Sequence, residues 1–159
     1  MDSLPLIMDE DPYFEPTEIA LPEGILVATM EFPEVRLDGL HEIFDGHFHE
    51  IAQAGPIGPG FAIYRGDISD EFDLIIGFPV AAPAEVEGVE TSIFPSGRAV
   101  IMSHLGGFDG LGSAWENLTE KHFAAGGEAP LAAIEIYVTD PSVVDHHDLR
   151  TDLLLLLPE

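Results

Sequence analysis

Glu135 and Tyr137 are the residues of this sequence whose types and spacing best suit binding or catalytic chemistry. They lie in the stretch AAIEIYVTDP, residues 132–141, which has the apolar and β-branched content of a buried strand. Because side chains alternate between the two faces of a strand, Glu135 and Tyr137 share one face, and isoleucines occupy the other. A carboxylate in an apolar cleft is costly unless it is protonated, hydrogen-bonded or paired with a cation. The pattern therefore predicts either the floor of a cation-binding pocket or an ordinary solvated sheet face.

The elements that would position this pair occur twice along the chain. Residues 21–27 match residues 94–100, and residues 61–64 match residues 134–137, both at an offset of 73 positions. Two matches at one offset predict a duplicated unit. Each unit reads as a strand, a helix and two further strands. The expected strands are about 24–31, 60–65 and 72–79 in the first copy, and about 97–104, 131–139 and 149–157 in the second.

Each copy is also expected to carry one helix, with an apolar stripe in residues 37–51 and another in residues 111–118. One copy alone is too small for a stable core, so the two should share one sheet about a pseudo-twofold axis. The predicted fold class is α+β: two pseudo-symmetric strand-helix-strand-strand repeats form one antiparallel sheet with two helices. The expected organisation is an acidic flexible N-terminal tail at 1–16 and one domain at 17–159, with repeat 1 at about 17–80 and repeat 2 at about 90–158.

The charge of the chain limits its partners. Thirty Asp and Glu against five Lys and Arg give a formal net charge of -25. Such a charge repels phosphates and anionic lipids, which argues against direct nucleic-acid binding and membrane association. The excess of acidic residues resembles proteins of salt-accumulating halophiles, in which carboxylates keep the surface soluble. With no cysteine, no signal peptide at the start and a leucine run at 153–157 too short to span a bilayer, a cytoplasmic protein is expected.

Several short motifs occur in an order that carries a family resemblance. They are Gly58-Pro59 with Tyr64, Pro95 to Val100, His104 to Leu111, Glu135-Ile136-Tyr137 with Asp140-Pro141, and Leu149-Arg150-Thr151 to Pro158. This order resembles the GyrI-like family, the AraC-type effector-binding domains, over about residues 17–158. The resemblance implies a tandem SHS2-type fold with a central cleft for small, often cationic and aromatic molecules, as in multidrug-binding proteins. It also implies a buried acid at the position of Glu135.

The same resemblance leaves the mode of action open. Some family members are effector domains joined to DNA-binding helices, some stand alone, and some stand-alone members hydrolyse cyclopropyl compounds. This chain of 159 residues has no room for a helix-turn-helix segment. Transcriptional control by this chain acting alone is therefore not expected.

Aromatic residues are expected to form the walls around Glu135. The candidates are Tyr64, Tyr137, Trp115 and Phe78, which would add cation-π attraction to a bound cation. The two tyrosines occupy equivalent positions of the two copies, whereas Glu135 matches an alanine in the first copy. The acid is therefore the feature that distinguishes one copy from the other. Trp115 reads equally well as a core residue beneath its helix.

The sequence supports three functions. The first is a stand-alone GyrI-like protein that sequesters or senses a hydrophobic, cationic aromatic ligand in a cleft between the repeats, with no cofactor. The second is a hydrolase in which Glu135 is the general base and Tyr137 holds the leaving oxygen. The third is an inhibitor module that binds a protein partner by acidic mimicry of nucleic acid. A homodimer and a separate regulator partner both stay open.

Histidines raise the question of a metal. His41, Asp45 and His49 are spaced at i, i+4 and i+8 of the first expected helix, so two of them could ligate one ion. Metal sites usually need a third converging ligand, and acidic helices are common on this surface. The pair His146-His147 is read as part of a hydrated loop. No metal site is assigned.

Overall fold

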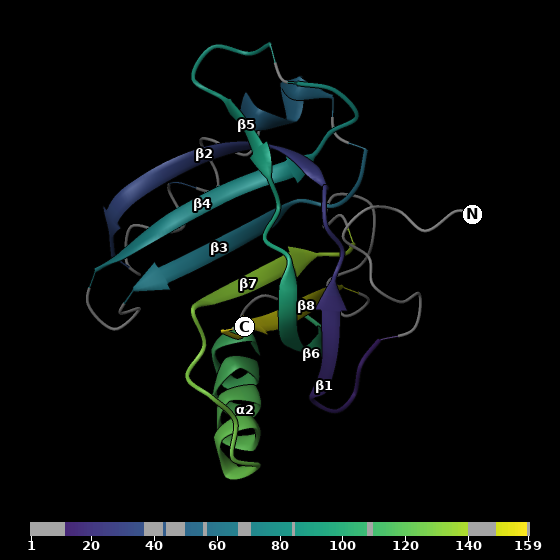
Figure 1. The fold of residues 1–159 in the computed structure, drawn as a ribbon, viewed down its shortest axis with the longest axis vertical. Helices are drawn as coiled ribbons and strands as arrows, with labels where there is room; N and C mark the ends of the chain where they lie inside the picture. The colour runs from purple at the N-terminus through teal and green to yellow at the C-terminus, as the bar shows by residue number, and fades with distance from the viewer. Residues whose placement is uncertain are drawn as a thin grey trace.

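The chain folds around one large antiparallel sheet with a helix packed against it (Figure 1). The computed structural model describes residues 12–36, 43, 50–55, 57–66, 71–83, 85–107, 110–139 and 149–158. The eight strands of the sheet lie in the order β1-β6-β8-β7-β3-β4-β2-β5. Their bounds are β1 Thr17–Leu21, β2 Leu26–Val35, β3 Phe61–Gly66, β4 Phe72–Pro79, β5 Glu90–Ile93, β6 Gly97–Leu105, β7 Ala132–Tyr137 and β8 Arg150–Leu156.

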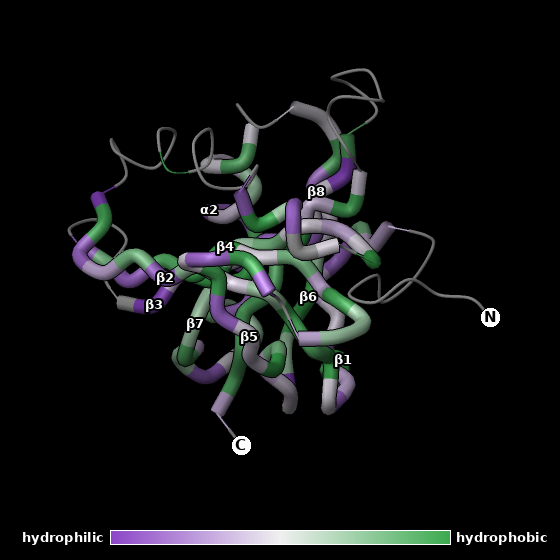
Figure 2. Tube along the Cα trace, turned by 90° about the horizontal axis from the view of Figure 1, so that it is seen from above, coloured by the Kyte–Doolittle hydropathy of each residue, from purple (hydrophilic) through white to green (hydrophobic). Residues whose placement is uncertain are grey.

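The central strands are buried on both faces. On β8, Leu154 and Leu156 belong to one apolar cluster, and Leu153 and Leu155 belong to another on the opposite face. A strand covered on both sides reads as a continuous apolar run, which explains the leucine run in the sequence. Figure 2 shows the resulting concentration of hydrophobic residues along β6 and β7.

The helix α2, Leu111–Ala124, covers one part of the sheet. Its buried residue Leu118 packs with Leu153 and Leu155 of β8, and Trp115 packs at the margin of the same cluster. Lys121 lies in its last turn, where a positive charge interacts favourably with the helix dipole. A short 3-10 helix, η2 Ala52–Ala54, precedes β3. None of the helices in the described ranges is long and apolar enough to cross a membrane.

Six strands lie where the sequence predicts them, and β1 and β5 were not expected. β1 pairs with β6 through Ile19↔Ala99, and β5 pairs with β2 through Thr91↔Ala28. The α+β class and the single antiparallel sheet are confirmed. The two-repeat arrangement stays a prediction, as does the first helix, because most of residues 37–49 lie outside the described part of the chain.

Ser103 of β6 joins the N-terminal segment to the sheet and also contacts a buried ion pair. Arg150 Nε and Nη2 donate to Asp152 at 2.9 and 3.0 Å, and the Ser103 hydroxyl donates to the same carboxylate at 2.7 Å. Tyr13 lies within the predicted N-terminal tail. Its backbone N–H donates to Ser103 Oγ at 2.8 Å, and its carbonyl accepts from Ser103 N at 2.7 Å. Tyr13 is therefore attached to β6.

Candidate functional site

Glu135 is a buried carboxylate in the middle of the sheet. It lies on β7, opposite Ala62 of β3 on one side and Leu153 of β8 on the other. Its side chain is 5% exposed. Since both cross-strand neighbours are apolar, neither can provide a hydrogen bond. The carboxylate needs donors from other rows of the sheet or from the helix.

Three aromatic side chains provide those donors. The Tyr64 and Tyr137 hydroxyls each donate to Glu135 Oε1 at 2.7 Å. The Trp115 indole Nε1–H donates to Glu135 Oε2, also at 2.7 Å. Hydrogen bonds to an ionised acceptor are shorter and stronger than those between neutral groups. The structure thus brings four of the five sequence-predicted site residues into direct contact.

Each donor is positioned by the geometry of its element. Ala62 of β3 is paired with Glu135 of β7. Tyr64 lies two residues beyond Ala62, and Tyr137 lies two residues beyond Glu135, so the side chains of Tyr64, Tyr137 and Glu135 are on one face of the sheet. Trp115 approaches from α2, which packs over that face.

The fifth predicted residue, Phe78, is near the site without touching the carboxylate. It lies on β4, paired with Ala28 of β2, and packs against the apolar cluster that also holds Tyr64 and Tyr137. Its position fits an apolar wall at the edge of the site. It is not among the hydrogen-bond partners of Glu135.

The electrostatics of the site follow from burial. Burial raises the pKa of Tyr64 well above its usual value, and the adjacent negative charge of Glu135 and the hydrogen bond to it act in the same direction. The pKa of Tyr137 is raised in the same way, first by burial and then by Tyr64 and Glu135. Both phenols therefore stay protonated and act as donors at neutral pH. Among the described residues, the Lys and Arg ion pairs involve other carboxylates.

Sequence reasoning missed one polar residue close to this group. Thr151 of β8 is directly opposite Tyr137 and fully buried, and its hydroxyl has no hydrogen-bond partner within the described part of the chain. The alternation of β8 places Thr151 and Leu153 on one face. Only the pairing register with β7 shows that this is the face of Glu135, and that register is absent from the sequence pattern.

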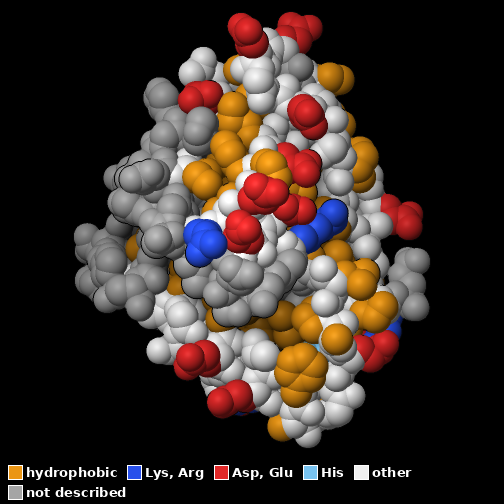
Figure 3. Space-filling model, turned by 90° about the vertical axis from the view of Figure 1, so that its left-hand side faces the viewer, with side chains coloured by type: hydrophobic (Ala, Val, Ile, Leu, Met, Phe, Trp, Pro, Cys, Tyr) orange, Lys and Arg blue, Asp and Glu red, His pale blue; other side chains and the backbone are white. Residues whose placement is uncertain are grey.

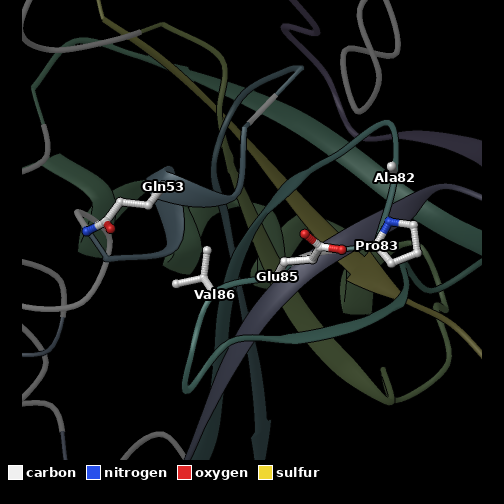
Figure 4. A pocket seen from close by; sticks show the side chains of 5 residues that line it. All are labelled: Gln53, Ala82, Pro83, Glu85 and Val86. Carbon is white, nitrogen blue, oxygen red and sulfur yellow. The ribbon is translucent and has the colours of Figure 1, made fainter.

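Two surface hollows lie elsewhere. The larger, of about 380 Å³, is formed by η2 and the connection from β4 to β5 (Figure 4). The smaller, of about 170 Å³, lies over β2 and the start of β5. The residues that line the larger are Gln53, Ala82, Pro83, Glu85 and Val86. Neither hollow is lined by Glu135 or by its three donors.

No metal-binding group of three ligands is found within the described ranges. His41, Asp45 and His49 lie outside those ranges, as does the pair His146-His147. The sequence assigned no metal site to these residues, and the structure does not test that assignment.

Comparisons with known proteins agree with this architecture. A family model described as GyrI-like small molecule binding domain matches residues 29–158. The C-terminal domain of EcmrR is similar with a TM-score of 0.74 and 17% identity, over 92% of this chain and 98% of that chain. SAV2435 bound to tetraphenylphosphonium is similar with a TM-score of 0.65 and 8% identity, over 89% of this chain and 93% of that chain.

A third similar structure is a hydrolase from Listeria innocua, with a TM-score of 0.59 and 16% identity over 92% of this chain and 93% of that chain. Comparison with curated protein sequences gives no match. At such identities the structural similarities show a shared fold. They leave the ligand and the chemistry to be argued from the residues of this chain.

Proposed function

Because the chain belongs to the family of GyrI-like small molecule binding domains, we propose that it binds a hydrophobic organic cation, with Glu135 as the anionic contact. The observation that carries this proposal is a buried carboxylate held by three neutral donors. Hydrogen bonds from phenols and an indole stabilise the negative charge without neutralising it. A cation that reaches the carboxylate therefore still meets a net negative charge, in a setting where water screens it less than at the surface.

The surroundings of the carboxylate favour a flat or aromatic cation over a metal ion. Tyr64, Tyr137 and Trp115 offer ring faces for cation-π contacts and for stacking. A divalent metal ion requires several oxygen or nitrogen ligands, whereas here one carboxylate is surrounded by aromatic carbon. The tetraphenylphosphonium bound to SAV2435, which has the same fold, supports the choice of a lipophilic cation as probe.

Ligand entry must displace part of the present arrangement, because Glu135 is only 5% exposed. Two of its donors are fixed to sheet strands, and the third, Trp115, comes from α2. We infer that Trp115 gives way to the ligand and that the tyrosines keep their bonds to Oε1. Trp115 is also the single tryptophan of the chain, so its fluorescence reports directly on the site.

The test compares Glu135→Gln with Glu120→Gln, a matched change at an exposed position of α2. Binding of tetraphenylphosphonium is followed by Trp115 fluorescence and calorimetry in concentrated KCl, with circular dichroism as a control for folding. We expect Glu135→Gln to weaken binding by about tenfold or more, since losing ~1.4 kcal/mol of charge attraction corresponds to one decade. Glu120→Gln should bind like the wild type. Equal affinity of Glu135→Gln and wild type would refute the proposal.

The hydrolase alternative uses the same residues and is separated by turnover. Glu135 would remove a proton from water as the water oxygen bonds to a carbon of the strained ring. The carbon–carbon bond of the ring would break, and the Tyr137 hydroxyl would donate to the substrate oxygen that takes up the released electron pair. Oε2 accepts one hydrogen bond, from Trp115, and so has a second lone pair for a proton. Release of product from a cyclopropyl substrate by the wild type, lost in Glu135→Gln, would establish the hydrolase. Binding without turnover favours sequestration or sensing.

Acidic mimicry is the third candidate, and the face shown in Figure 3 gives it less support. On the face shown in Figure 3, acidic side chains lie among hydrophobic ones, and a group of them lies between two basic side chains. A nucleic-acid mimic needs a continuous acidic track. Salt distinguishes acidic mimicry from ligand binding at Glu135. Binding through exposed charges weakens as the salt concentration rises, whereas binding in a buried site persists.

A further inference from the structure

Thr151 carries a polar group that the fold itself does not use. It is 0% exposed, and its hydroxyl makes no hydrogen bond to any residue that the structure describes. Burying a hydroxyl without a partner is unfavourable, and most buried polar atoms in folded proteins are paired. A valine would fill the same space in a strand without this cost. Because the hydroxyl lowers stability, a role in binding would explain its presence at this position.

Thr151 lies on the same face of the sheet as Glu135. Thr151 is opposite Tyr137 of β7 and opposite His104 of β6, and Leu153 is opposite Glu135. Thr151 and Glu135 are thus diagonal neighbours on one face of adjacent strands. Such neighbours lie about 7–8 Å apart, within reach of one small molecule.

The neighbours of Thr151 are committed to other partners. The Tyr137 hydroxyl donates to Glu135. His104 Nε2 lies 2.9 Å from the Gly107 carbonyl oxygen, so this nitrogen carries a proton and donates. The backbone of Gly110 lies against the His104 ring, which leaves no room for a β-carbon at residue 110. The ring is therefore held in the turn before α2.

We propose that Thr151 is a second polar contact of the ligand site and sets its specificity. This inference rests on the proposed function: the positive charge of the ligand lies at Glu135, and a hydroxyl or carbonyl group of the same ligand bonds to Thr151 Oγ1. The preferred ligand class is then an organic cation with a hydrogen-bonding group roughly 5–8 Å from its charge. Cations without such a group bind through Glu135 alone.

The test uses two probes that differ in one hydroxyl: propyl-triphenylphosphonium and 3-hydroxypropyl-triphenylphosphonium. We expect the wild type to bind the hydroxylated probe about threefold to tenfold more tightly, the range of one net hydrogen bond. Thr151→Val, which keeps the shape of the side chain, should remove this preference, so that the variant binds the two probes with equal affinity. Thr151→Ser, which keeps the hydroxyl, should restore part of it.

The outcomes separate this inference from the proposed function. If both probes bind in a Glu135-dependent manner and their affinity ratio is the same in the wild type and Thr151→Val, the role of Thr151 is wrong and the proposed function stands. If neither probe binds the wild type, or if Glu135→Gln binds both probes as tightly as the wild type does, the proposed function is wrong. The inference about Thr151 is then wrong as well. Thermal unfolding of Thr151→Val confirms that the variant is folded.

Discussion

Alkaline pH should destabilise the folded state, because two of its tyrosines are buried. The pKa values of Tyr64 and Tyr137 are raised well above 10 in the folded chain, mainly by burial and also by the charge of Glu135. In the unfolded chain the same phenols ionise near pH 10. Above that pH the folded state keeps two protons that the unfolded state releases, so raising the pH favours unfolding.

The size of the effect follows from linkage. If both phenols stay protonated in the fold, the free energy of unfolding falls by about 2.8 kcal/mol between neutral pH and pH 11. The limiting slope is roughly 2.7 kcal/mol per pH unit, twice that of one group. Tyr64→Phe should reduce both figures by about half, because one titrating group remains.

The assay is denaturant unfolding at a series of pH values, combined with tyrosinate absorbance near 295 nm. A Tyr13→Phe background isolates the two site phenols, since the chain has three tyrosines. We expect their absorbance to rise only with loss of the folded circular dichroism signal. Reversible ionisation of both phenols near pH 10 with the fold intact would show that they are not held at a buried carboxylate.

Two further predictions concern stability away from the site. Arg150→Leu leaves the fully buried Asp152 carboxylate without its cation, so the free energy of unfolding, measured with denaturant, should fall by about 3–5 kcal/mol. The control, Arg98→Leu at an exposed ion pair, should change the free energy of unfolding little. Equal effects of the two changes would contradict the stabilising role of the buried pair. Gly77→Ala would place a β-carbon against a backbone carbonyl of β2 and should cost roughly 1–3 kcal/mol. In Gly112→Ala the new β-carbon meets open space in α2, so the change should be neutral or stabilising by about 0.5–1 kcal/mol. If Gly77→Ala were tolerated in the same unfolding assay, β2 and β4 would be able to move apart at no cost in free energy.

Much of the site was predictable from local pattern, because strand alternation and the internal echo both mark the same residues. The alternation of β7 put Glu135 and Tyr137 on one face, and the echo in β3 pointed to Tyr64. The hydrogen-bonded group then follows once the two strands are adjacent. Whether Trp115 was core or site could not be decided from helical spacing, and the structure shows it bonded to the carboxylate and packed on the apolar cluster.

Features that depend on pairing between distant strands could not be predicted. β1 and β5 are strands of five and four residues at the two edges of the sheet, too short for an alternation signal. Thr151 joins the site only through the register of β8 against β7. The sequence places Arg150 and Asp152 in the expected strand 149–157, but their burial follows only once both faces of β8 are known to be covered.

The placement of the two edge strands has a consequence for folding. β1, the earliest strand, pairs with β6 at one edge, and β5 pairs with β2 at the other. A chain cut in the segment between β4 and β5 would separate each edge strand from the ladder that it completes. Neither fragment could therefore form its full set of strand pairs, and we infer that the whole sheet assembles in a single cooperative step. Because these closing contacts join residues far apart in sequence, that step should be slow compared with helix formation.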